Sequence, residues 1–146
     1  QGLAETGRYT VSERVFRAVQ AEFSCGFCTD AQGAQTIGKT FREKNYLLDT
    51  HTAVACTVLE GYRAETGDGT LTVVESTASP FKFCGSVLSA LGEKDIASGL
   101  DVLDQLSEKT GLAAPAPLAG LRGKEVRFTT TVEKEHMVDA VLSMLE

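Results

Sequence analysis

The chain has 146 residues and a net charge of −6, and this length predicts one domain, residues 1–146, with a core of its own. The acidic balance argues against a nucleic-acid-binding surface, because phosphate binding needs clustered Lys and Arg. No apolar run approaches the roughly 20 residues that span a bilayer, and no signal-peptide pattern is present, so we expect a cytoplasmic protein without membrane contact.

The first residues have the pattern of a helix end. Residues 2–6 form its last turn, and Gly7 ends it as a left-handed glycine. A chain that opens on Gln1 and on a helix tail is expected to be a piece of something longer. Thr10 or Ser12 then caps a second helix. Its apolar stripe consists of Val15, Phe16, Val19 and Phe23.

Two helices flanking a short strand follow. Asp30 caps the first helix and Asn45 ends it. Its inner positions are Ala34, Ile37 and Phe41. Residues 46–48 are a short buried strand. Residues 49–52 then open a helix over residues 53–63, which is apolar on most sides and is expected to be well buried.

The second half repeats this alternation. Residues 71–75 form a strand, and Ser79 with Pro80 starts a helix over residues 80–91. Its inner stripe consists of Phe81, Cys84, Val87, Leu88 and Leu91. A helix with Ile96, Leu100, Leu103 and Leu106 on one face and ended by Gly111, a strand over residues 126–132 and a final amphipathic helix over residues 137–145 complete the chain.

The order strand, helix, strand, helix predicts an α/β fold with a short, mostly parallel sheet flanked by helices. Ligands of open parallel sheets bind beyond the carboxyl ends of the strands. Residues 49–52 and 76–79 both occupy such positions. We therefore expect these two loops to lie side by side at one edge of the sheet.

The hydroxyl groups of Ser76, Thr77 and Ser79 cluster at this predicted edge. They can cap the following helix and satisfy the turn, or they can hold an anionic or heteroaromatic ligand with the help of helix N–H groups. Lys82 lies in the first helical turn, where a cation opposes the helix dipole, and this indicates an anionic partner. The sequence leaves both interpretations open.

The other predicted loop carries a carboxylate and an imidazole two residues apart, Asp49 and His51. Asp49 is either the cap of its helix or a ligand-binding group, and His51 is either a surface residue or its partner. The second histidine, His136, is expected to be an exposed helix residue.

Cys25 and Cys28 form a Cys-x-x-Cys pair, the spacing of thiol–disulfide exchange sites. A helix rather than a strand precedes the pair, so the context differs from that of a thioredoxin-like motif. No second pair and no paired histidines accompany it, and we expect no metal site. A thiol-redox or binding module built on this pair remains the alternative hypothesis, and Cys56 and Cys84 are expected to face the core as small apolar groups.

Two stretches resemble motifs of one enzyme family. Residues 46–55 resemble the Leu-Leu-Asp-Pro-His-Thr-Ala-Val-Ala motif of bacterial and fungal threonine synthases, and residues 76–83 resemble their Ser-Thr-Ala-Ser-Pro-Tyr-Lys-Phe motif. The spacing between the two stretches also fits. The resemblance covers nearly the whole chain but only about the C-terminal third of such an enzyme.

The resemblance implies part of a fold type II enzyme that uses pyridoxal 5′-phosphate (PLP). Such an enzyme converts O-phospho-L-homoserine and water to L-threonine and phosphate. Thr77 matches the hydroxyl that faces the cofactor's pyridine nitrogen, with Ser76 beside it in the cofactor site. Asp49 and His51 match a motif that borders the substrate region, where they would position groups, and Lys82 matches a lysine that could hold the substrate phosphate.

The chain also departs from the family. Thr50 replaces a motif proline, and residues 84–85 replace the usual proline after Phe83. The lysine that forms the Schiff base with PLP lies in the missing N-terminal portion, and neither Lys39 nor Lys82 has its Ser-Phe-Lys context. We expect no catalytic residue in this chain and no activity by itself. An absent partner domain would leave apolar surface that can drive self-association, and a purely structural role for the piece is a third hypothesis.

Overall fold

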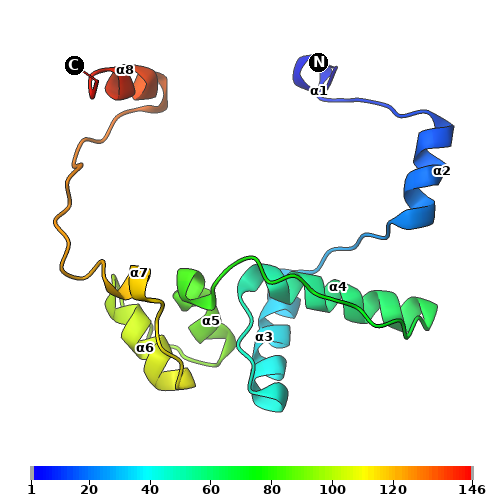
Figure 1. Cartoon of the computed structure of the whole chain (residues 1–146), viewed down its shortest axis with the longest axis horizontal. Coiled ribbons are helices and arrows are strands. Elements are labelled where there is room, and N and C mark those ends of the chain that lie inside the picture. Colours follow the sequence, from blue (N-terminus) through cyan, green and yellow to red (C-terminus); the bar gives the residue numbers. More distant parts are fainter. Residues whose placement is uncertain (1, 146) are drawn as a thin grey trace.

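The computed structural model describes residues 2–145, which form helices joined by extended segments (Figure 1). The α-helices are α1 (Gly2–Thr6), α2 (Glu13–Glu22), α3 (Asp30–Lys44), α4 (Thr50–Thr66), α5 (Cys84–Ala90), α6 (Asp101–Thr110), α7 (Ala116–Ala119) and α8 (Met137–Leu142). The 3-10 turns η1 (Pro80–Phe83) and η2 (Lys134–His136) lead into α5 and α8. Within the described residues, no helix has the length and apolar character that a membrane crossing requires.

The α/β prediction is wrong, because none of the described residues forms a β-strand. Residues 46–48 are an extended link between α3 and α4 whose two leucines are buried. Residues 71–75 run along α4, where the Arg63 guanidinium donates to the Thr70 carbonyl oxygen at 2.9 Å. The alternating pattern gives a local preference for extended backbone, but a strand also needs a neighbour, and none lies beside these segments.

The third predicted strand is also absent. Residues 126–132 belong to the long extended segment between α7 and α8, drawn in orange in Figure 1. Val126 and Phe128 are exposed, as are the other residues of this segment. Because the strand is absent, the prediction that it has one buried face and one solvent-exposed face is also wrong.

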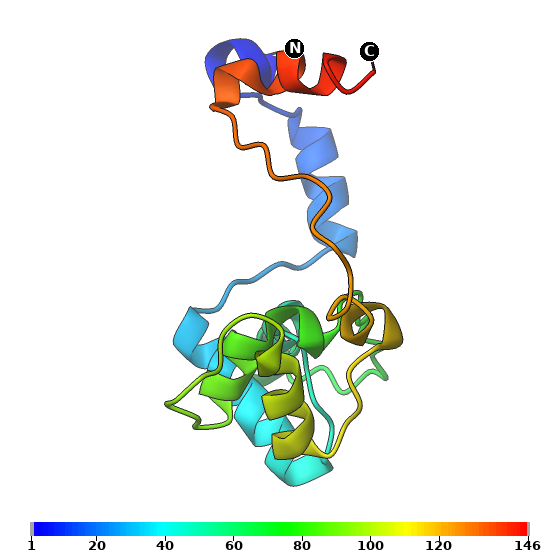
Figure 2. The ribbon, with the colours of Figure 1, turned by 90° about the vertical axis from the view of Figure 1, so that its left-hand side faces the viewer.

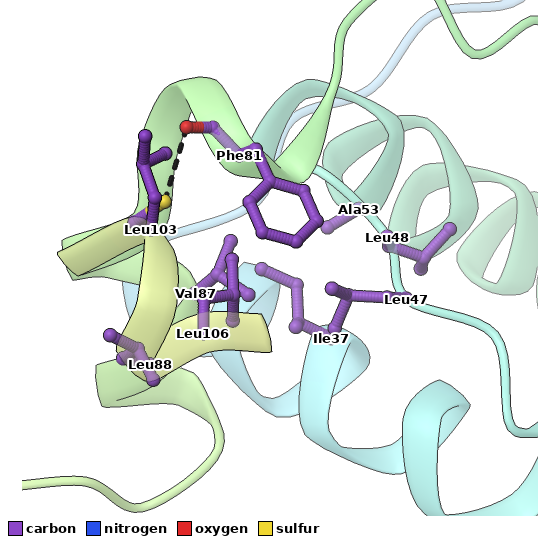
Figure 3. Packing of buried hydrophobic residues seen from close by; sticks show 10 residues of the cluster. Ile37, Leu47, Leu48, Ala53, Phe81, Val87, Leu88, Leu103 and Leu106 are labelled. Carbon is purple, nitrogen blue, oxygen red and sulfur yellow. Dashed lines mark hydrogen bonds between the residues drawn. The ribbon is translucent and has the colours of Figure 1, made fainter. Parts of the chain in front are cut away.

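The core lies in a central body, residues 26–122, that α3 to α7 build. Helix α3 packs against α4 and α5, and α5 packs against α6. The buried residues that meet there are Ile37, Leu47, Leu48, Ala53, Phe81, Cys84, Val87, Leu88, Leu103 and Leu106 (Figure 3). The apolar stripe predicted for residues 80–91 forms much of this core. Burial of these side chains is the main stabilising contribution that the packing shows.

Close contacts fix how α3 lies against its neighbours. A Cβ atom at Gly38 would stand 2.9 Å from the carbonyl oxygen of Ala90, so the absence of a side chain lets α3 approach the end of α5. On the side of α4, the hydroxyl oxygens of Thr36 and Thr57 lie 2.7 Å apart and share a hydrogen bond. Helix α3 is thereby held between α5 and α4.

Helix boundaries follow local chemistry closely. Thr29, one residue before the predicted cap, makes a capping box with Gln32 at the start of α3. Asn45 ends α3 as predicted, with a left-handed φ of 50°. The expectation of a well-buried fourth helix is wrong: Thr52 and Ala53 are its buried residues, and the rest of α4 is half-buried or exposed.

Two arms leave the same side of the central body (Figures 1 and 2). The N-terminal arm, residues 2–22, contains α1 and α2, and the C-terminal arm, residues 124–145, contains η2 and α8. None of their described residues is buried. The predicted apolar stripe of α2 exists but faces solvent, with Phe16 48% exposed.

Salt bridges and side-chain hydrogen bonds hold the second half of the central body together. The Arg122 guanidinium pairs with Asp101 at 2.9 Å and Asp104 at 2.8 Å and so fastens the end of α7 to the first turn of α6. The Gln105 side chain donates to the Asp95 carbonyl oxygen at 2.7 Å and accepts from the Ala97 amide at 2.9 Å. The predicted helix therefore starts later than Ile96, because these residues form a loop.

Candidate functional site

The site is built around Asp49, the residue that precedes α4. Its carboxylate accepts hydrogen bonds from the amides of His51 at 2.8 Å and Thr52 at 3.2 Å, so Asp49 caps the helix. The Thr52 hydroxyl donates to the second carboxylate oxygen. Asp49 is 1% exposed, so a complete set of donors surrounds a buried charge.

Ser76 connects this cap to the other predicted loop. Its Oγ donates to Oδ2 of Asp49 at 3.3 Å and lies 3.1 Å from Oγ1 of Thr52. The loops at residues 49–52 and 76–79 therefore lie side by side as predicted, although the parallel sheet that motivated the prediction is absent. A direct contact between side chains joins the two segments.

The electrostatics of Asp49 follow from this geometry. Burial by itself would raise the pKa of the carboxyl, but the hydrogen bonds from Thr52, from the His51 amide and from Ser76 outweigh burial and hold this pKa below its ordinary value. Asp49 is therefore ionised at neutral pH. An ionised carboxylate has acceptors and no proton to give.

His51 and Phe83 make a second contact between the two predicted motifs. Their ring centroids are 4.9 Å apart and the rings are inclined by 30°, so they stack. The Thr50 hydroxyl lies 3.1 Å from Nδ1 of His51. The imidazole side chain is 65% exposed, and this leaves it accessible from solvent.

The remaining candidates differ in their surroundings. The Ser79 hydroxyl accepts a hydrogen bond from the Phe81 amide at 3.3 Å. Ser79 therefore caps η1, as the capping interpretation predicted. Thr77 is exposed, and its hydroxyl makes no hydrogen bond with any described residue. Lys82 is exposed and pairs with no acid among the described residues. Thr77 and Lys82 are thus available to groups outside this chain.

A cavity of about 300 Å³ lies next to this region, between the first turns of α3 and α4 and the outer face of α5. Its lining includes Cys28, Thr50, Val54, Ser86 and Ser89. Nothing in the sequence pattern indicated it, because its residues come from three separate helices and from the segment that precedes α3. Thr52 was not predicted as a partner of Asp49, although the spacing Asp-x-x-Thr at a helix start could have indicated it.

The cysteines and lysines of the described residues show no site of their own. Cys25 is exposed, Cys28 and Cys56 are half-buried and Cys84 is buried, all as free thiols. Lys39 pairs with Glu60 at 3.3 Å and links α3 to α4. No group of three or more potential metal ligands occurs among residues 2–145.

The family described as "Threonine synthase, C-terminal" matches residues 52–142. The chain belongs to the threonine synthase family. Threonine synthase of Saccharomyces cerevisiae is 29% identical over an alignment of 115 positions that covers 75% of this chain and 22% of that protein. Threonine synthase-like 1 of Homo sapiens is 27% identical over 88 residues, 60% of this chain and 11% of that protein.

A solved structure gives the same result. The crystal structure of PLP-bound threonine synthase from Brucella melitensis matches with a TM-score of 0.55 and 33% identity over 76% of this chain and 22% of that one. The chain thus spans about a fifth of the length of the yeast and Brucella proteins. The predicted resemblance to the C-terminal portion of a threonine synthase is confirmed, and these relatives give no support to the thiol-redox alternative.

Proposed function

We propose that this chain is the C-terminal part of a PLP-dependent threonine synthase of fold type II, which acts in the cytoplasm on O-phospho-L-homoserine and water to give L-threonine and phosphate. The observation that carries the proposal is the hydrogen bond between Asp49 and Ser76. It brings the two family motifs together and presents the exposed hydroxyl of Thr77 beside them.

The donor set of this region suits PLP. When bound, PLP withdraws electrons from the substrate carbon skeleton and so supplies the central chemistry of the reaction. The Thr77 hydroxyl has no hydrogen-bond partner among residues 2–145 and can donate to an unprotonated pyridine nitrogen. The Asp49 carboxylate is buried and already accepts hydrogen bonds from its neighbours, so it is not available to the ring nitrogen.

The substrate side of the proposal rests on His51 and Lys82. Both are exposed on the segments that Asp49 and Ser76 hold together, and the ammonium group of Lys82 favours an anionic group such as a phosphate. We assign them to orienting the substrate. The chain by itself is expected to be inactive, because Lys39 is engaged with Glu60 and no lysine here has the context of a Schiff-base residue.

The same proposal covers the partners of the chain. The exposed apolar stripe of α2 and the apolar residues of α8 would be covered by the rest of the parent enzyme, and in its absence they can drive self-association. No basic patch for nucleic acid is expected from a chain with a net charge of −6.

The experiment that tests the function replaces Thr77 in a full-length enzyme that carries this chain. Thr77→Asp should change the visible absorption of bound PLP and slow turnover, because a neighbouring carboxylate would stabilise the protonated form of the ring nitrogen. Thr77→Ser is the matched control and should preserve both properties, because it keeps the donor. An unaltered spectrum and an unaltered rate in Thr77→Asp would contradict the role given to Thr77.

A further inference from the structure

The hydrogen bonds among Asp49, Thr52 and Ser76 restrict where two protons can lie. Three contacts join the three side chains: Thr52 with Asp49, Ser76 with Asp49 at 3.3 Å, and Thr52 with Ser76 at 3.1 Å. The ionised carboxylate contributes no proton, and each hydroxyl contributes one. The two hydroxyl protons can therefore serve only two of the three contacts at one time.

The geometry favours an arrangement that uses the Ser76 proton inside this cluster, because the ionised Asp49 carboxylate is a stronger acceptor than the water that reaches the exposed Ser76 side chain. If Thr52 donates to Asp49, Ser76 donates either to Asp49 or to Thr52. If Thr52 donates to Ser76 instead, Ser76 must donate to Asp49, since the carboxylate, which is 1% exposed, would otherwise lose both of its hydroxyl donors. Ser76 therefore turns lone pairs, and not a proton, toward its exposed side.

We propose that Asp49 is a positioning residue that divides the roles of the two adjacent hydroxyls, making Ser76 an acceptor held in place and leaving Thr77 as the donor to a heteroaromatic nitrogen. The inference rests on the proposed function for its ligand, but the proton assignment of Ser76 stands on this chain alone. Ser76 is thus removed from direct donation to the cofactor nitrogen, a role that the sequence alone left open to both hydroxyls.

The first experiment uses the 146-residue chain without cofactor and follows the Asp49 carboxyl by carbon-13 NMR during a pH titration. Ser76→Ala removes one donor to the carboxylate and should raise the apparent pKa of Asp49 relative to the wild type. Thr77→Val, which removes a hydroxyl at constant shape, should leave the titration unchanged. Identical titrations in all three proteins, or a shift in Thr77→Val as large as that in Ser76→Ala, would overturn the assignment.

A double-mutant cycle on unfolding supplies a second measurement. Asp49→Asn and Ser76→Ala should be non-additive, by roughly threefold or more in the unfolding equilibrium constant, because they remove the same hydrogen bond. Asp49→Asn and Thr77→Val should be additive. Additivity in the first pair would count against the proposal. If Asp49→Asn does not fold, Thr52→Val replaces it in the cycle.

The last experiment uses the PLP-loaded full-length enzyme and reads the absorption maximum of the cofactor. Thr77→Val should shift this maximum, and Ser76→Ala should leave it in place while weakening PLP binding, because the turn is less well held. An equal spectral shift in Ser76→Ala would overturn the division of roles. If Thr77→Val leaves the absorption maximum unchanged while the NMR titrations give the expected result, the proposed function of Thr77 is refuted and the proton assignment of Ser76 remains intact.

Discussion

The imidazole of His51 stacks on the ring of Phe83 at a centroid distance of 4.9 Å, although 32 positions of the chain separate them. The first residue lies in the opening turn of α4 and the second in η1, the turn before α5. Together with the Asp49–Ser76 hydrogen bond, this stack gives two independent contacts between the segments. The arrangement of the two motifs is therefore fixed by the chain itself.

The stack should contribute measurably to stability. We expect His51→Ala to lower the free energy of unfolding by about 0.5–1 kcal/mol, the range of an aromatic pair at a partly exposed site. Urea denaturation of the chain measures it. His136→Ala is the control, because His136 is exposed and stacks on no ring among the described residues. Equal effects of the two substitutions would argue against the stack.

Asp49 should make stability depend on pH with a defined sign. Its pKa is lower in the folded chain than the value of about 3.9 expected when unfolded, so the unfolded chain binds more protons as pH falls. The contribution is therefore fully present above about pH 5 and is lost as pH falls through the folded pKa.

Asp49→Asn keeps a good helix cap but cannot titrate. At pH 6 the wild type should exceed it in unfolding free energy by about 1–3 kcal/mol, as expected for hydrogen bonds to a charge. Chemical denaturation at a series of pH values should show this difference shrinking toward pH 3. A difference that stays constant over that range would contradict the ionised, hydrogen-bonded state of Asp49.

Two glycines within helices should respond in opposite directions to the same substitution. Gly38→Ala places a Cβ 2.9 Å from the Ala90 carbonyl oxygen, and the resulting overpacking should lower stability by about 1 kcal/mol or more despite the better helix propensity of alanine. Gly61→Ala meets no atom within 4 Å and should raise stability by about 0.5–1 kcal/mol. Thermal unfolding compares them, and the same sign for both would contradict the close approach of α3 and α5.

Leucine-to-alanine substitutions in the core and in the arms should differ clearly in their effect on the free energy of unfolding. Leu106 is 0% exposed, and Leu106→Ala should cost about 2–5 kcal/mol of unfolding free energy by leaving a cavity. Leu142, in α8, is 55% exposed, and Leu142→Ala should change the unfolding free energy by less than about 0.5 kcal/mol. A comparable loss in both variants would show that α8 is packed in the isolated chain.

The four thiols should react in the order of their accessibility. Cys25 is exposed and should be alkylated first by iodoacetamide at neutral pH. Burial raises the pKa of the Cys84 thiol and of the Cys56 thiol, so both should react slowly, with the buried Cys84 last. Timed quenching followed by peptide mass spectrometry gives the order. Modification of Cys84 in the native chain as fast as that of Cys25 would contradict its place in the core.

Local chemistry could be predicted from the sequence, and pairing between distant segments could not. Asn45 as a helix end, Ser79 as a cap and the stripe of Phe81, Cys84, Val87 and Leu88 follow from residue types at fixed spacings, and the structure confirms them. The alternating pattern at residues 71–75 and 126–132 correctly indicated a preference for extended backbone. The prediction that these residues form strands was wrong. A sheet depends on a neighbouring strand, which no local pattern can supply.

The candidate site shows the same division. The loops that carry Asp49 and Ser76 were predicted to lie side by side from a sheet topology that the described residues do not have, and a helix cap that reaches across to the second segment brings them together instead. Thr52, which completes the cluster, was overlooked although its spacing from Asp49 is local, whereas the cavity beside Cys28 escaped prediction because it depends on how three helices pack. The roles assigned to Thr77, His51 and Lys82 stay predictions.

The two arms have a consequence for any denaturation experiment on this chain. The steepness of a urea transition scales with the surface that unfolding newly exposes to solvent, and residues that are already solvated contribute little to it. Because neither arm holds a buried residue, the m-value should correspond to a protein the size of the central body and fall short of that expected for 146 residues. In a full-length parent, where the arms would be covered, the same residues would join the cooperative transition and steepen it.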